Sequence, residues 1–149
     1  MRSILDLPRL GDDPDAPFPA TRLALKSPNG LLAWGGDLHP RRLLRAYREG
    51  IFPWYSQGQP VLWWSPAPRC VIHPEGVYLS TRTRRRYNTG RYRLTADTAF
   101  SDVIAGCAAP RDRDQGTWIT TELRAAFERL HRWGQNALFP GQPLFLHIR

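Results

Sequence analysis

The chain has 149 residues, and its 21 Lys and Arg residues against 13 Asp and Glu residues give a formal net charge of +8. No stretch approaches the ~18 consecutive apolar residues of a membrane-spanning helix. The two cysteines, Cys70 and Cys107, fit neither a zinc site nor a disulfide framework. We therefore expect a cytoplasmic protein without a metal site, and the basic charge favours a polyanionic partner.

The first half predicts short elements separated by turns. Residues 1–20 are polar and rich in proline, which predicts a loosely held arm. Ser27-Pro28-Asn29-Gly30 is a turn signal, since proline fixes the first corner and Asn-Gly tolerates positive φ. A short apolar element follows at 31–34, and strands are predicted at 61–64 and 69–72.

The clearest helix lies between Asp37 and Gly50. Pro40 fits the first helical position, Asp37 and His39 are candidate caps, and Gly50 is the expected stop. The 3.6-residue period places three apolar or aromatic side chains on one face: Leu43, Leu44 and Tyr47.

The second half predicts a basic, partly helical stretch at 79–88, a strand at 92–95 and two amphipathic helices. The first helix carries Phe100, Val103, Ile104 and Cys107 on its apolar face, with Thr98 or Asp97 as cap and Cys107 buried. The second carries Leu123, Ala126, Phe127 and Leu130, begins at Thr120 and ends at Gly134. This order predicts a mixed α+β chain.

A dense run of arginines is the first candidate for function. No acid lies between Glu75 and Asp97, and the run comprises Arg82, Arg84, Arg85, Arg86, Arg91 and Arg93. Because guanidinium groups match phosphate in two-point contacts, a nucleic-acid backbone is a natural partner. A solvated surface helix explains the same charges about equally well.

Aromatic residues are the second candidate, because flat rings beside cations stack on unpaired bases. The set comprises Tyr47, Phe52, Trp54, Tyr55, Trp63, Trp64 and Trp118. Core packing is the competing explanation for any one of them. It applies best to Trp63-Trp64, of which at least one is expected to face inward on a strand, whereas Trp54 on a proline-bounded turn is expected to be exposed.

Catalytic motifs are missing from this sequence. It contains no HExxH, GxSxG or P-loop pattern, and its four histidines are scattered. Composition and spacing alone indicate a basic, aromatic-rich globular protein with RNA among its candidate partners.

Three longer runs resemble one family. They are the stretch from Ser27 to Leu38 that continues from Leu43 to Tyr55, the run Leu62-Trp63-Trp64-Ser65-Pro66-Ala67-Pro68-Arg69, and Gly116-Thr117-Trp118-Ile119-Thr120 followed by Leu130-His131. In this order and spacing they closely resemble the leucyl/phenylalanyl-tRNA–protein transferases, over about residues 18–137.

The resemblance implies an aminoacyltransferase that moves Leu or Phe from Leu-tRNA or Phe-tRNA to the N-terminal Arg or Lys of an acceptor protein, which marks that protein for N-end rule degradation. It implies no coenzyme. Tyr47, Trp54 and Trp118 match positions that help to hold the 3′-terminal aminoacyl-adenosine. Thr81-Arg82-Thr83 and the arginines that follow match a basic helix that holds the tRNA backbone; the arginines concerned are Arg82, Arg84, Arg85 and Arg86.

The resemblance also implies a domain plan. A small N-terminal α/β domain at 21–68 would follow the arm, and the first part of an N-acetyltransferase-like domain would occupy 69–136. Residues 137–149 depart from the family pattern, and Pro140 and Pro143 there disfavour a central strand. The family's half with the catalytic groups and the side-chain pocket lies beyond this point, so we expect no retained catalytic residue.

Three functions remain open from the sequence. The first is an aminoacyltransferase whose 149-residue polypeptide alone has little or no activity, as a frameshifted or prematurely terminated gene product would. The second is a non-enzymatic tRNA- or RNA-binding fragment, and the third is a non-functional truncated product.

Overall fold

A computed structural model describes residues 6–71, 73–90, 94–96, 98–109, 117–136 and 146–148. The helices are α1 (Pro40–Arg48), α2 (Thr81–Asn88), α3 (Phe100–Ala108) and α4 (Thr121–Asn136), with 3₁₀ turns at Thr21–Leu23 and Pro74–Gly76. The strands are β1 (Arg9–Leu10), β2 (Leu31–Gly35), β3 (Phe52–Pro53), β4 (Leu62–Trp64), β5 (Leu94–Ala96) and β6 (Leu146–Ile148). These elements confirm the α+β class.

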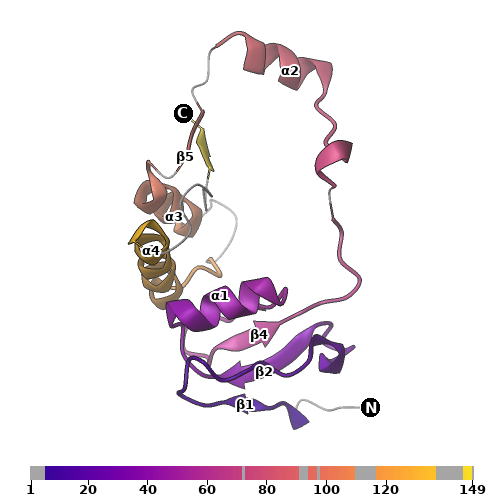
Figure 1. The fold of residues 1–149 in the computed structure, drawn as a ribbon, viewed down its shortest axis with the longest axis vertical. Helices are drawn as coiled ribbons and strands as arrows, with labels where there is room; N and C mark the ends of the chain where they lie inside the picture. The colour runs from indigo at the N-terminus through magenta and orange to yellow at the C-terminus, as the bar shows by residue number, and fades with distance from the viewer. Residues whose placement is uncertain are drawn as a thin grey trace.

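The main sheet has the strand order β1-β2-β4-β3. β1 pairs with β2 in parallel, and β4 pairs antiparallel with β2 on one side and β3 on the other. Figure 1 shows α1 lying along this sheet, α3 and α4 beyond it, and α2 at the opposite end of the fold, reached from β4 through a long connection. β5 and β6 form a separate antiparallel pair.

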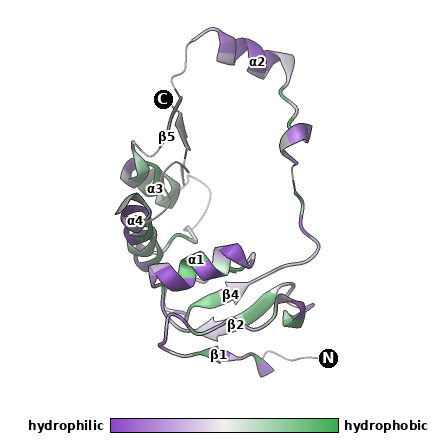
Figure 2. Ribbon diagram, in the orientation of Figure 1, coloured by the Kyte–Doolittle hydropathy of each residue, from purple (hydrophilic) through white to green (hydrophobic). Residues whose placement is uncertain are grey.

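One hydrophobic core joins the sheet to the helices. It contains side chains of the sheet, α1, α3 and α4 in a single cluster, and its large, fully buried apolar side chains include Leu32, Leu43, Ile51, Trp63 and Leu123. Figure 2 shows the apolar residues on the sheet, α1, α3 and α4, whereas α2 is mostly hydrophilic. The core therefore fixes α4 against α1 and leaves α2 outside it.

Helix α1 is confirmed with the predicted caps. Pro40 is its first residue, the His39 ring accepts a hydrogen bond from the Arg41 N–H, and the Asp37 carboxylate accepts one from the His39 N–H. Gly50 follows the helix with φ +71°, a left-handed conformation that glycine adopts without strain.

The prediction of a loosely held arm is wrong for its described part, residues 6–20. β1 extends the main sheet, and Leu10 and Phe18 are buried. The Phe18 ring packs edge-on against Trp63, with 4.9 Å between centroids. Arg42, fully buried on α1, donates hydrogen bonds to the carbonyl oxygens of Gly11 (2.7 Å) and Asp13 (2.8 Å).

The strand predicted at 69–72 and the basic helix predicted at 79–88 have different outcomes. The strand expected at 69–72 is absent at 69–71, and Ile72 lies outside the described residues. The Arg69 guanidinium bonds to the carbonyl oxygens of Gly50 and Pro66, which ties the chain to the end of α1 instead of to a strand partner. The basic helix is confirmed as α2.

The second half follows the predicted order with local corrections. β5 begins at Leu94, while Tyr92 and Arg93 lie outside the described residues. The N-cap of α3 is Ala99, so Thr98 is not the cap, and Asp97 lies outside the described residues. Cys107 is exposed rather than buried, because Phe100 and Ile104 alone carry the fully buried contacts of α3.

Helix α4 starts as predicted and ends later. The Thr120 hydroxyl accepts a hydrogen bond from the Leu123 N–H (3.1 Å), which is an N-cap contact. The helix continues past Gly134 to Asn136, so the predicted stop at Gly134 is wrong. Residues 137–145 lie outside the described residues.

Replacing Arg42 with alanine is expected to lower the free energy of unfolding by about 3 kcal/mol, because two arm carbonyls and the Asp37 carboxylate lose a buried charged donor. Urea denaturation followed by tryptophan fluorescence measures this change. Arg41→Ala is the matched control, since its ion pair with Asp15 is about half exposed on both sides. That control should change stability by less than ~0.5 kcal/mol, and equal losses in the two variants would contradict a special role for Arg42.

Candidate functional site

Trp54 has a fixed backbone and an exposed ring. Its N–H donates to the Leu62 carbonyl oxygen (3.0 Å), and its own carbonyl accepts from the Trp64 indole N–H (2.7 Å). The Trp54 and Trp64 ring centroids lie 5.6 Å apart. The Trp54 side chain is nevertheless 51% exposed, so β4 holds this residue in place while its indole faces solvent.

Trp118 lies on the turn before α4 and, like Trp54, combines a fixed backbone with an exposed ring. The Thr117 hydroxyl accepts a hydrogen bond from the Ile119 N–H (3.1 Å), and Ile119 and Thr120 are buried. The turn is therefore anchored on both sides of Trp118, whose side chain is 49% exposed.

The two segments that carry these indoles meet at Tyr55, the residue after Trp54. The Tyr55 hydroxyl donates to the Glu122 carboxylate (3.3 Å). Burial raises the pKa of Tyr55, with the nearby Glu122 charge as a smaller cause, so its phenol remains a donor at neutral pH.

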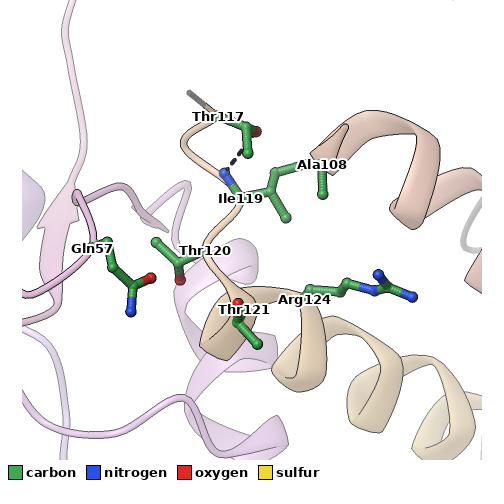
Figure 3. A pocket seen from close by; sticks show the side chains of 7 residues that line it. All are labelled: Gln57, Ala108, Thr117, Ile119, Thr120, Thr121 and Arg124. Atoms are coloured by element: carbon green, nitrogen blue, oxygen red, sulfur yellow. Dashed lines mark hydrogen bonds between the residues drawn. The ribbon is translucent and has the colours of Figure 1, made fainter. Parts of the chain in front are cut away.

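A cavity of about 350 Å³ lies between the same two segments. Figure 3 shows Gln57, on the turn between β3 and β4, opposite Thr120 and Thr121 at the start of α4. The remaining lining residues are Ala108, Thr117, Ile119 and Arg124. Gln57 is three residues after Trp54, and Thr117 and Ile119 flank Trp118, so both indole-bearing segments border one cavity although neither indole lines it.

Tyr47 lies in the last turn of α1, the helix that contacts both β3 and α4. Its side chain is 43% exposed, yet burial of its hydroxyl raises the pKa to about 12. A neutral phenol at physiological pH donates hydrogen bonds and also offers a flat ring for stacking. The structure thus places Tyr47 on a helix that contacts both β3, which precedes Trp54, and α4, which follows Trp118.

Helix α2 presents its arginines to solvent. Ser80 caps its start by accepting from the Thr83 N–H (3.1 Å), and the Thr89 hydroxyl donates to the Arg86 carbonyl at its end (2.7 Å). Every residue of α2 is exposed. Within the described part of the chain, no carboxylate lies within ion-pair distance of the four predicted phosphate-binding residues, Arg82, Arg84, Arg85 and Arg86.

Arg84 and Arg85 line a shallow hollow of about 370 Å³ together with Thr81, Asn88 and Thr89. Guanidinium, hydroxyl and amide groups on one helix face are donors suited to phosphate oxygens. Arg91 and Arg93 lie outside the described residues. Figure 1 shows α2 far from the aromatic residues' elements, so the arginines and the aromatic residues form two separate surfaces.

The described residues form neither a metal-binding cluster nor a membrane-spanning helix. Among them, no three His, Cys, Asp or Glu side chains gather to hold a metal ion. Across the same ranges, no helix has the length and apolarity to cross a bilayer.

Sequence reasoning missed the contacts that join the two indole-bearing segments. Glu122 is an acid in the first turn of α4, where the helix dipole favours it, but no sequence pattern indicated that its carboxylate also accepts from Tyr55. Gln57 carried no signal either, because its partners across the cavity lie some sixty residues away in sequence.

Exposed rings combined with unneutralised arginines are typical of proteins that bind unpaired nucleic acid. Residues 36–67 match the family model described as the leucyl/phenylalanyl-tRNA protein transferase N-terminal domain, and residues 71–138 match the model described as leucyl/phenylalanyl-tRNA protein transferase. The chain belongs to this transferase family, and the second match agrees with the expected acyltransferase-like part.

Individual relatives agree with these matches, and three of them carry the name leucyl/phenylalanyl-tRNA–protein transferase. The protein of Stutzerimonas stutzeri (strain A1501) is 56% identical over 120 residues, which are 80% of this chain and 53% of the relative. That of Xanthomonas campestris pv. campestris (strain B100) is 56% identical over 126 residues, 84% and 51% of the two chains. That of Alkalilimnicola ehrlichii is 53% identical over 122 residues, 82% and 47%. The chain therefore spans about half the length of the curated relatives it matches.

Proposed function

We propose that this chain supplies the tRNA-binding part of a cytoplasmic aminoacyltransferase. The reaction moves Leu or Phe from aminoacyl-tRNA to the N-terminal Arg or Lys of an acceptor protein, in the N-end rule pathway. Family membership and the relatives' names support the transfer reaction. The observation that carries the proposal for these residues is the pair of half-exposed indoles, Trp54 and Trp118, on segments that border one cavity.

The aromatic residues are suited to hold the 3′-terminal aminoacyl-adenosine. Adenine has two flat faces, and each contact with an indole contributes about 1–3 kcal/mol. Tyr47 adds a neutral phenol that donates to ribose or ester oxygens. Together these groups would fix the ester without touching its acyl carbon.

The arginines of α2 are suited to hold the tRNA body. Their charges are exposed and unpaired within the described part of the chain, so a polyanion gains their full attraction. Backbone contact of this kind reads the shape of a folded RNA rather than its base sequence, which fits an enzyme acting on more than one tRNA.

The chemistry of the transfer requires positioning above all. The neutral α-amine of the acceptor attacks the ester carbonyl, the new C–N bond forms, and the ribose oxygen leaves with the electron pair of the broken C–O bond. The nitrogen proton must pass to a base or to the leaving oxygen. Because an aminoacyl ester is already activated, holding it in a reactive orientation lowers much of the barrier.

We also propose a domain boundary near residue 68, with a small domain at 21–68 and an incomplete acyltransferase-like domain at 69–136. The interval between the two family matches, after residue 67 and before residue 71, supports this division. The extended connection after β4 falls at the same point.

A binding-only role for this polypeptide is the second candidate. It is favoured by the aromatic and arginine surfaces, both of which bind RNA without requiring the transfer step. The two functions differ in turnover, and a non-functional product would differ from both by showing no cooperative thermal melting.

Trp54→Ala and Trp118→Ala are each expected to weaken binding of a tRNA carrying an amide-linked phenylalanine by about tenfold, because each removes one stacking contact of about 1–3 kcal/mol. Fluorescence anisotropy with labelled tRNA measures the loss. The same tRNA without its 3′-terminal adenosine should bind both variants and the parent protein equally.

Trp133→Ala is the control for loss of an exposed indole, since Trp133 is 38% exposed and lies roughly 18 Å along α4 from Thr121. It should leave both affinities unchanged. An equal effect of all three substitutions, or an effect that persists without the terminal adenosine, would remove the proposed adenosine site.

Arg85→Ala is expected to weaken tRNA binding at low salt and to reduce the slope of log affinity against log salt concentration by about one, because one phosphate contact is lost. Arg22→Ala removes the same charge from an exposed position on the first 3₁₀ turn and should leave the slope unchanged. Equal slopes for the two variants would show that only net charge matters and would contradict a specific role for α2.

The 149-residue polypeptide is expected to bind tRNA but to give little or no transfer of leucine to an Arg-initiated acceptor protein. We expect its aromatic residues and arginines to bind and orient the tRNA, and we expect no catalytic residue to be retained. The assay uses radiolabelled Leu-tRNA, with the Xanthomonas relative as the positive control. Robust leucylation by this polypeptide would refute the expectation.

A further inference from the structure

We propose that Tyr55 and Glu122 form a positioning pair that sets the separation of Trp54 and Trp118 without touching the tRNA. This inference rests on the proposed function of the two indoles. The pair is a hydrogen bond of 3.3 Å between residues that are 67 positions apart in the chain. It is a direct side-chain link between the turn after β3 and the first turn of α4.

The Tyr55 end of the pair is rigid. Its side chain is only 4% exposed and belongs to the main hydrophobic core. The main-chain N–H and carbonyl of its neighbour Trp54 are both hydrogen-bonded to β4, to the Leu62 carbonyl and the Trp64 indole respectively. A shift of the Tyr55 hydroxyl would therefore require movement of the segment that carries Trp54.

The Glu122 end of the pair lies on the helical turn that directly follows the Trp118 segment. Glu122 lies in the first turn of α4, where the helix dipole favours its negative charge. Thr120 caps that turn by accepting a hydrogen bond from the Leu123 N–H. Trp118 is four residues before Glu122, so the pair links the residue after Trp54 to the helical turn that follows Trp118.

The separation of the two rings matters for a ligand that contacts both. A flat base between two aromatic surfaces needs them about 7 Å apart, twice a contact distance of about 3.5 Å. A small displacement weakens dispersion contacts steeply, so fixing the two segments in advance reduces the ordering required on binding. The cavity between Gln57 and Thr120 lies between the two segments that the same link joins.

The pair is tested by a double-mutant cycle with Tyr55→Phe, Glu122→Ala and the combination. Each single variant is expected to lower affinity for the tRNA with amide-linked phenylalanine three- to tenfold, and the double variant should lose no more than either one. Affinity for the tRNA without its terminal adenosine should not change. Glu122→Gln keeps an accepting oxygen and should retain most of the affinity.

Asp102→Ala is the matched control, because Asp102 is also an acid in the first turn of a helix and lies on α3. It should leave adenosine-dependent binding unchanged. Additive losses in the double variant would overturn the pairing. Lower melting temperatures for Tyr55→Phe and Glu122→Ala with unchanged adenosine-dependent affinity would show a purely structural contact and would also overturn it.

The outcome separates this inference from the proposed function. If Trp54→Ala and Trp118→Ala weaken binding while the Tyr55 and Glu122 variants do not, the positioning pair is wrong and the adenosine site stands. If the two tryptophan variants have no effect, the adenosine site itself fails.

Discussion

The complete burial of Trp63 in strand β4 is the constraint on which the rest of the structure depends. Its indole N–H donates to the Gly35 carbonyl (3.0 Å), so a large ring is buried with its polar atom satisfied. Because successive strand residues face opposite sides, Trp64 points away from the core. The Trp64 indole N–H then donates to the Trp54 carbonyl. The alternating side chains of β4 therefore fill the core on one face and hold the Trp54 backbone on the other.

The site itself depends on packing between distant parts of the chain. α4 packs against α1, and the core that joins them brings residues 117–124 next to the turn after β3. α2 takes no part in that core. The molecule therefore combines aromatic groups on a fixed framework with cations on an exposed helix, two surfaces whose binding energies have different origins.

Local signals were enough to predict much of the fold. The caps of α1 could be predicted because His39, Pro40 and Gly50 each act on residues within one helical turn of themselves. The same holds for Thr120 at the start of α4. The arm was predicted wrongly because its attachment depends on Arg42, about thirty residues away, and a buried arginine has no sequence signature. For the site, the exposure of Trp54 followed from its turn, whereas the role of Trp118 came only from family resemblance. The Tyr55–Glu122 contact joins two distant segments and could not be read from either.

Half-exposed indoles on an ordered backbone have a physical consequence for binding. Trp54 exposes apolar area to water, which costs stability, but both its main-chain groups are already bonded, so its segment loses little conformational freedom when a base stacks on it. The arginines of α2 act in the opposite way, since long exposed side chains attract a polyanion from a distance but lose freedom on contact, and salt screens them. Attraction by α2 would thus govern how fast and how tightly the RNA body is captured. The preordered rings would govern where its 3′ end stops, and for an ester that is already activated that placement is the larger part of the task.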